Sequence, residues 1–178
     1  MVIGTSCAGK STFAAALGAK LGLPVVELDA LYWGPDWTAA SPEAFRASVE
    51  RATAGDAWIA EGNYGAVREL LWSRAGTIIW LNYGFPLVLW RAVRRTVSRS
   101  LRGTELWNGN RESLRRSFLA RDSILVWVVQ TFHRRQREFH RLRASGAFAQ
   151  LEWIELRTPA QAQALLAAPI PVQAPPAS

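Results

Sequence analysis

The sequence predicts a single α/β domain built on a mostly parallel sheet. Short apolar runs alternate along the chain with amphipathic stretches, which is the pattern of strands joined by crossover helices. The runs are apolar, as expected of strands that helices cover on both faces. The 178 residues correspond to about one domain, and their 49% hydrophobic content excludes wholesale disorder.

Apolar runs and helix caps place the elements. The strands are expected at residues 2–3, 24–28, 57–61, 77–82 and 151–156. Ser41 followed by Pro42 is typical of a helix start, and Thr158 followed by Pro159 repeats that signal. Helices are therefore expected at residues 9–21, 42–55, 66–74 and 86–102, in one or more pieces over 111–144, and from 159. One domain would span residues 1–168, followed by a disordered Pro/Ala-rich tail at 169–178.

Cysteine content and hydropathy exclude several classes of protein. The lone Cys7 cannot form a disulfide within the chain, and no Cys/His cluster resembles a zinc site. The longest apolar run, residues 124–129, is far shorter than the roughly 18 residues that span a bilayer. We therefore expect a soluble, cytoplasmic protein without a membrane partner. Monomer and dimer both stay open.

The net charge of +7 is concentrated in one segment. Residues 91–143 contain fourteen arginines and four acidic residues, whereas the rest of the chain is acidic by three charges. Three interpretations are open: a solvated surface, a phosphate clamp in which arginine binds phosphate bidentately, or contact with nucleic acid. The clamp interpretation favours Arg91, Arg95, Arg111 and Arg115 as catalytic residues.

The predicted helix over residues 86–102 has two stripes. Arginines recur at helical spacing on one face, and an apolar stripe runs along another. We expect the apolar stripe to pack in the core. Its residues are Trp90, Val93, Val97 and Leu101.

The strongest signal is a phosphate-binding loop. Residues 4–11 read G-T-S-C-A-G-K-S and match G-x-x-x-x-G-K-[ST], after an apolar stub and before an Ala-rich helix. The glycines let backbone N–H groups turn inward around a phosphate, and the helix N-terminus adds positive charge. Lys10 would reach the β- and γ-phosphates of ATP, and Ser11 would ligate Mg²⁺. The nucleotide-binding residues are then Gly4, Thr5, Ser6, Cys7, Ala8, Gly9, Lys10, Ser11 and Thr12.

Acidic residues at strand ends complete the candidate site. A P-loop kinase needs an acid for the Mg²⁺ shell and often another for the acceptor hydroxyl. Glu27 and Asp29 close the second predicted strand, where i, i+2 spacing would place both on one face. Glu61 closes the third strand, and Asn82 closes the fourth.

Three tracts carry a family resemblance. They are L-D-A-L-Y-W-G-P-D-W at residues 28–37, W-I-A-E-G-N-Y at 58–64 and L-W-N-G-N-R-E at 106–112. Over residues 2–168 the chain resembles adenylate-kinase-like P-loop kinases, and it is most similar to the group called DNA topology modulation (FlaR-related) proteins. The resemblance implies a three-layer P-loop NTPase fold, with strand order 2-3-1-4-5 and a small helical lid at about 103–121.

The same resemblance implies roles for the site residues. Glu61 stands where adenylate kinases carry Asp and would be the Mg²⁺ acid, beside Ser11. Asp29 is similar to the second of the paired acids in gluconate and shikimate kinases and would orient the acceptor hydroxyl. Arg91 and Arg95 look like the arginines at the foot of the lid.

The acceptor segment departs from true adenylate kinases, because aromatic residues stand where the AMP-binding pattern with its Arg is expected. Trp33 and Trp37 are predicted either to stack on a ring of the acceptor or to anchor the loop. Asn63 and Tyr64 are further candidate substrate contacts.

These observations predict ATP- and Mg²⁺-dependent phosphoryl transfer to a small acceptor, such as a nucleotide or nucleoside. The alternative is a nucleotide-dependent, DNA-associated regulator that uses the basic segment 91–143. A third possibility is a protein that binds nucleotide without transferring phosphate.

Overall fold

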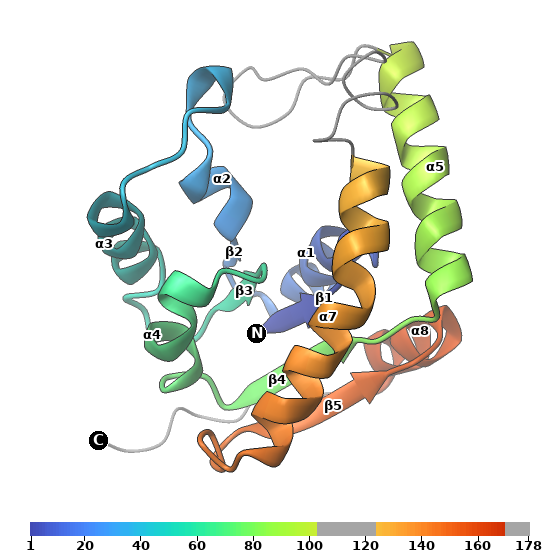
Figure 1. The fold of residues 1–178 in the computed structure, drawn as a ribbon. Helices are drawn as coiled ribbons and strands as arrows, with labels where there is room; N and C mark the ends of the chain where they lie inside the picture. Colours follow the sequence, from blue (N-terminus) through green and yellow to red (C-terminus); the bar gives the residue numbers. More distant parts are fainter. Residues whose placement is uncertain (103–123, 170–178) are drawn as a thin grey trace.

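A computed structural model describes residues 1–102 and 124–169. Its centre is a sheet of five parallel strands in the order β2-β3-β1-β4-β5, as the sequence predicted (Figure 1). The strands are β1 (Val2–Gly4), β2 (Val25–Glu27), β3 (Ile59–Glu61), β4 (Thr77–Leu81) and β5 (Glu152–Leu156). The predicted lid, Arg111, Arg115 and nearly all of the predicted tail lie outside the described residues.

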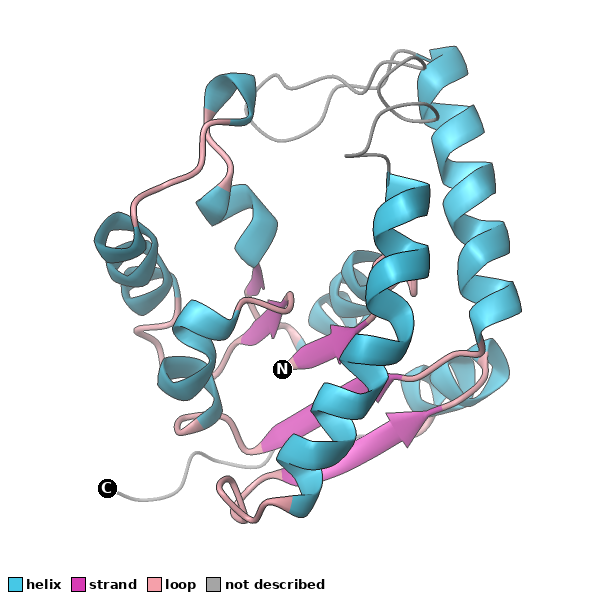
Figure 2. Ribbon diagram, in the orientation of Figure 1, coloured by secondary structure: helices cyan, strands magenta, loops and turns pink. Residues whose placement is uncertain are grey.

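Helices cover both faces of the sheet. They are α1 (Lys10–Leu21), α2 (Leu28–Tyr32), α3 (Pro42–Ala52), α4 (Arg68–Trp72), α5 (Phe85–Arg102), α7 (Ile124–Ala144) and α8 (Pro159–Ala167), with short 3-10 turns η1 (Pro35–Trp37) and η2 (Gly65–Val67). In Figure 2 α7 crosses in front of the strands, while α1 and α8 lie behind them. The predicted caps at Ser41 and Thr158 are present, the latter as a full capping box with Gln161.

Successive strand residues point into two separate cores, one on each face of the sheet. Ile79 and Leu81 pack with residues of α1, α5 and α8. Ile78 and Trp80 pack with residues of α3 and α4. Helix α7 contributes to both cores, since Phe132 belongs to the first and Phe139 to the second. The three-layer arrangement is therefore held by apolar packing on both faces.

The strand register brings the candidate site to one edge of the sheet. Glu27 of β2 pairs with Glu61 of β3, and Gly4 of β1 pairs with Leu81 of β4. Because all five strands are parallel, their carboxyl ends meet at this edge. The phosphate loop and the strand-end acids therefore lie together.

The end of the second strand differs from the prediction. β2 stops at Glu27, and α2 begins at Leu28, so Asp29 lies in the first turn of a helix. The expectation that strand alternation puts Glu27 and Asp29 on one face is therefore wrong. Leu28 is fully buried in the core beneath α3, and the acid at 29 suits the positive end of a helix.

The apolar stripe of α5 also differs from the prediction. Trp90, Val93 and Val97 are 55%, 41% and 41% exposed. The buried face instead consists of Val88, Ala92 and Thr96, which are spaced four residues apart. Both stripes have helical spacing, so periodicity alone could not tell them apart. Small side chains allow α5 to pack closely on α7.

In the described parts of the chain, no helix is both long and apolar enough to cross a membrane.

Matched valine truncations on α5 test which stripe is buried. Val88→Ala should lower the free energy of unfolding by about 2 kcal/mol, because it removes two buried methyl groups. Val97→Ala should change it by no more than about 0.5 kcal/mol. The gain in helix propensity is the same at both positions, so the difference in urea denaturation reports burial. Equal losses would show that the stripe predicted from the sequence is buried as well.

Candidate active site

The phosphate loop leaves the sheet at Gly4 and enters α1 at Lys10. Gly4 and Gly9 have positive φ values of 151° and 96°. A Cβ at Gly4 would lie 2.7 Å from the Leu81 carbonyl oxygen, and one at Gly9 would lie 3.3 Å from the Arg91 guanidinium. Gly4 is therefore required for space as well as for conformation, and Gly9 for its conformation.

The inside of the loop is suited to an anion. Gly9 is the N-cap of α1 and has no side chain to cap it, so the first N–H groups of the helix have no side-chain cap among the described residues. The Thr5 hydroxyl is buried and has no hydrogen-bond partner among the described residues. Cys7 has a positive φ of 64°, and alternating backbone conformations of this kind form anion-binding nests. A phosphate group would satisfy these donors.

Lys10 supplies the positive charge of the loop. Its ammonium donates a hydrogen bond of 3.2 Å to the Thr5 carbonyl. Burial lowers the pKa of Lys10, while the carboxylates of Glu61 and Asp29 act in the opposite direction. An ammonium group has three N–H donors, so Lys10 can keep this bond and still bind phosphate oxygens.

Ser11 and Glu61, the predicted magnesium residues, lie together. The Ser11 hydroxyl donates a 2.9 Å hydrogen bond to Glu61 Oε1, which joins α1 to the end of β3. Glu61 is 2% exposed, and burial raises its pKa against the opposing charge of Lys10. Hydroxyl and carboxylate oxygens are the hard ligands that Mg²⁺ prefers.

These two residues fit a magnesium ion that keeps other ligands. Within the described ranges no group of three His, Cys, Asp or Glu side chains could hold a metal. Mg²⁺ usually keeps several waters and takes one or two carboxylates together with substrate phosphates. A Ser11–Glu61 pair beside an anion-binding loop satisfies that requirement.

Asp29 and Tyr64 meet beyond the ends of β2 and β3. The Tyr64 hydroxyl donates a 2.5 Å hydrogen bond to Asp29 Oδ1. The Tyr64 ring packs against Tyr32 and Phe45, with centroid separations of 4.8 Å and 5.0 Å. Burial raises the pKa of Tyr64, and the adjacent Asp29 raises it further. Tyr64 is therefore protonated and donates to Asp29.

Asn63 binds the first glycine of the phosphate loop. Its Nδ2 donates to the Gly4 carbonyl at 2.5 Å, and its Oδ1 accepts from the Gly4 N–H at 3.3 Å. Both ends of the amide thus hold the backbone where β1 becomes the phosphate loop. The predicted contact of Asn63 with substrate stays a prediction.

Arg91 contacts the phosphate loop directly. Its Nη1 donates a 2.7 Å hydrogen bond to the Ala8 carbonyl, and its guanidinium lies 5.1 Å from the centroid of the Tyr83 ring. Arg95 is close enough that its charge lowers the pKa of Lys10. The structure therefore brings both arginines to the phosphate loop. Sequence reasoning missed Tyr83, because nothing in its local pattern marks it.

Trp33 and Trp37 lie in a loop that closes on itself. Gly34 N donates to Thr38 O at 2.8 Å, and Ala40 N donates to Tyr32 O at 2.9 Å. The two indole rings meet edge to face at 5.9 Å, and both are partly exposed. This geometry anchors the loop. Stacking on an acceptor stays a prediction.

A polar network that sequence reasoning missed joins α7 to the carboxyl edge of the sheet. Asn82 follows β4, accepts a 2.7 Å hydrogen bond from Gln136, and donates one of 2.7 Å to Glu155. The sequence marked Asn82 only as the end of a strand. Its contacts are with residues more than 50 positions away, which local patterns do not reveal.

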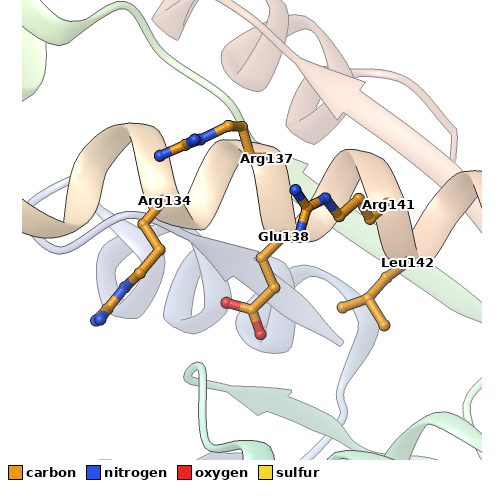
Figure 3. Close-up of a pocket in the computed structure, with 5 residues that line it drawn as sticks. All are labelled: Arg134, Arg137, Glu138, Arg141 and Leu142. Carbon is orange, nitrogen blue, oxygen red and sulfur yellow. The ribbon is translucent and has the colours of Figure 1, made fainter.

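Arginines of α7 line a groove of about 530 Å³ (Figure 3). Its lining residues are Arg134, Arg137, Glu138, Arg141 and Leu142. Glu138 accepts hydrogen bonds from Arg68 of α4 and, at 3.0 Å, from Arg135. Burial acts to raise the pKa of Glu138, but the two arginines together outweigh it and the pKa is lowered. Nucleic-acid contact through the basic segment stays a prediction.

Comparisons with models of protein families and with curated protein sequences gave no match. Among solved structures, the chain is similar to a shikimate kinase from Bacteroides thetaiotaomicron, with a TM-score of 0.53 and 16% identity over 93% of this chain and 92% of that chain. It is also similar to a candidate kinase from Chloroflexus aurantiacus, with a TM-score of 0.45 and 16% identity over 93% of this chain and 94% of that chain. We base the fold on the first similarity alone.

This chain has a P-loop kinase-like fold. The shikimate kinase similarity and the strand order both support it. The finer grouping with DNA topology modulation proteins is not confirmed.

Glu138 should make stability depend on pH. A carboxyl whose pKa is lowered by folding stabilises the folded state above its unfolded value, and this contribution is lost as the pH falls through the folded pKa. Glu138→Gln should therefore lower the free energy of unfolding by about 1 kcal/mol at pH 7, since the group is partly exposed, and by much less at pH 3.

Urea denaturation at both pH values measures this effect. Glu50→Gln is the control, because Glu50 forms an exposed pair with Arg46 on α3 and should have little effect at either pH. An equal loss at pH 7 and pH 3 for Glu138→Gln would show that the ionised carboxylate does not stabilise the fold.

Proposed function

We propose that this protein transfers a phosphoryl group from ATP to a hydroxyl group of a small acceptor. The observation that carries the proposal is the Ser11–Glu61 hydrogen bond, which places a hydroxyl and a buried carboxylate beside the phosphate loop. Phosphoryl transfer needs phosphate-binding donors, a magnesium site and an acid near the acceptor. Residues with these properties occur at one edge of this sheet.

The donor half binds and orients the triphosphate. Backbone N–H groups of residues 4–12 would bind phosphate oxygens, with Lys10 as the neutralising charge. Ser11 and Glu61 would hold Mg²⁺, which when bound neutralises negative charge on the phosphates. Arg91 stabilises the conformation of the phosphate loop through its hydrogen bond to the Ala8 carbonyl, and Arg95 adds positive charge close to Lys10. These fixed charges stabilise the transition state without reorganisation.

The acceptor half orients a hydroxyl for in-line attack. Asp29 would accept a hydrogen bond from that hydroxyl and take its proton as the new bond to phosphorus forms. Asp29 is half-buried and already accepts one hydrogen bond from Tyr64 on Oδ1. Trp33 and Trp37 are close in sequence and partly exposed, and they could contribute a stacking surface for a ring.

The acceptor is proposed only as a small, hydroxyl-bearing molecule, with nucleosides and nucleotides as the first candidates. The similar solved structure is that of a shikimate kinase. At 16% identity its fold supports the proposal, but its acceptor does not carry over to this chain.

Lysine substitutions test the proposal. Lys10→Ala should lower the rate of acceptor-dependent ADP release by about 10²- to 10³-fold, because it removes the charge that neutralises the transferring phosphate. Lys20→Ala is a matched control, since Lys20 is the other lysine of the chain and binds carbonyls at the end of α8. A panel of nucleosides, nucleotides and sugars should be assayed with ATP and Mg²⁺.

Two outcomes would contradict the proposal. Unchanged turnover in Lys10→Ala would exclude the phosphate loop as the donor site. ATP binding by the wild-type protein without phosphorylation of any acceptor would favour a nucleotide-binding protein that does not transfer phosphate.

A further inference from the structure

One hydrogen bond organises the acceptor side of the proposed site. The Tyr64 hydroxyl donates to Asp29 Oδ1 at 2.5 Å. A phenol hydroxyl has a single proton to donate, and in this structure the Tyr64 proton goes to Asp29.

Packing holds Tyr64 in this position. Its ring contacts Phe45, which is 1% exposed, and Tyr32, which itself packs on Phe45 at 5.1 Å. An aromatic ring fixed on two sides cannot swing away without breaking both contacts. A hydrogen bond of 2.5 Å to a carboxylate is at the short, strong end for an O–H donor.

The same loop also holds the phosphate loop. Asn63, the residue before Tyr64, binds both backbone groups of Gly4. Glu61, two residues earlier, binds Ser11. One four-residue segment therefore contacts the start of the phosphate loop, the candidate magnesium serine and the candidate acceptor acid. Any displacement of the segment would move Asp29 and the phosphate loop relative to each other.

We propose that Tyr64 is a positioning residue that fixes the Asp29 carboxylate relative to the phosphate loop. Tyr64 occupies Oδ1 and leaves Oδ2 for the acceptor hydroxyl. This role rests on the proposed function.

The competing explanation is that the Tyr64 hydroxyl occupies the place of the acceptor hydroxyl and is displaced by it. The two explanations predict different kinetics. Loss of a positioning hydrogen bond lowers kcat, whereas loss of an occupant strengthens acceptor binding.

Hydroxyl deletions separate these explanations. Tyr64→Phe keeps the ring and should lower kcat about 10- to 100-fold, the range expected for a hydrogen bond to a charged group, with little change in the KM for ATP. Tyr32→Phe, a hydroxyl deletion in the same aromatic cluster, should leave kcat unchanged. A lower acceptor KM with undiminished kcat in Tyr64→Phe would overturn the proposal.

A second measurement needs no turnover. Protein labelled with ¹³C at the tyrosine Cζ should give three resonances, one for each tyrosine. Tyr64→Phe identifies the Tyr64 signal, and Asp29→Asn should shift that signal while leaving the Tyr83 signal in place. A Tyr64 signal that Asp29→Asn does not shift would contradict the Tyr64–Asp29 hydrogen bond whatever the activity. Failure of the wild-type protein to phosphorylate any acceptor would instead contradict the proposed function.

Discussion

The geometry of the whole site depends on how the chain passes Gly4. This residue ends β1 between β3 and β4, with so little room that a Cβ would lie 2.7 Å from the Leu81 carbonyl. Both of its backbone polar groups are bound by Asn63. The direction in which the phosphate loop leaves the sheet is therefore set from two sides, by β4 packing and by the loop after β3. Because Lys10 and Ser11 begin the helix that follows the phosphate loop, their positions depend on that turn.

The site contains two oppositely charged side chains, Lys10 and Glu61, that are largely buried from solvent. Burial lowers the pKa of Lys10 and raises that of Glu61, while each opposes the shift of the other. Groups of this kind are costly to bury unless they are paired. In the described structure Lys10 bonds a carbonyl and Glu61 bonds a serine hydroxyl. A phosphate on the lysine and a cation on the carboxylate would neutralise both, which supports the proposed magnesium–triphosphate ligand.

Local patterns were sufficient for much of the fold and for the donor half. The phosphate loop, the caps at Ser41 and Thr158 and the strand order followed from residues close in sequence or from the family resemblance. The end of β2 was not predicted correctly, because Leu28, expected as the last strand residue, instead begins α2 and packs in a core with residues of α3. On α5 two stripes of residues recur with the same helical period. Which stripe is buried depends on the helices that pack against it, and the sequence pattern does not show this.

The contacts that organise the candidate site join residues that are far apart in sequence. Asn63 meets Gly4 across 59 positions, Arg91 meets Ala8 across 83, and Tyr64 meets Asp29 across 35. Sequence reasoning did select Arg91, Asn63 and Tyr64. It could not state what they touch, and the structure gives Asn63 and Arg91 contacts with the phosphate-loop backbone.

A crystal structure with Mg²⁺ and a non-hydrolysable ATP analogue tests the central claim most directly. The account predicts that the phosphates bind within residues 4–12 and that Mg²⁺ lies at Ser11, within about 2.1 Å of its hydroxyl oxygen, on the side of Glu61. Asp29 should face the terminal phosphate across the acceptor site. A nucleotide bound elsewhere, or a cation away from the Ser11–Glu61 pair, would contradict it.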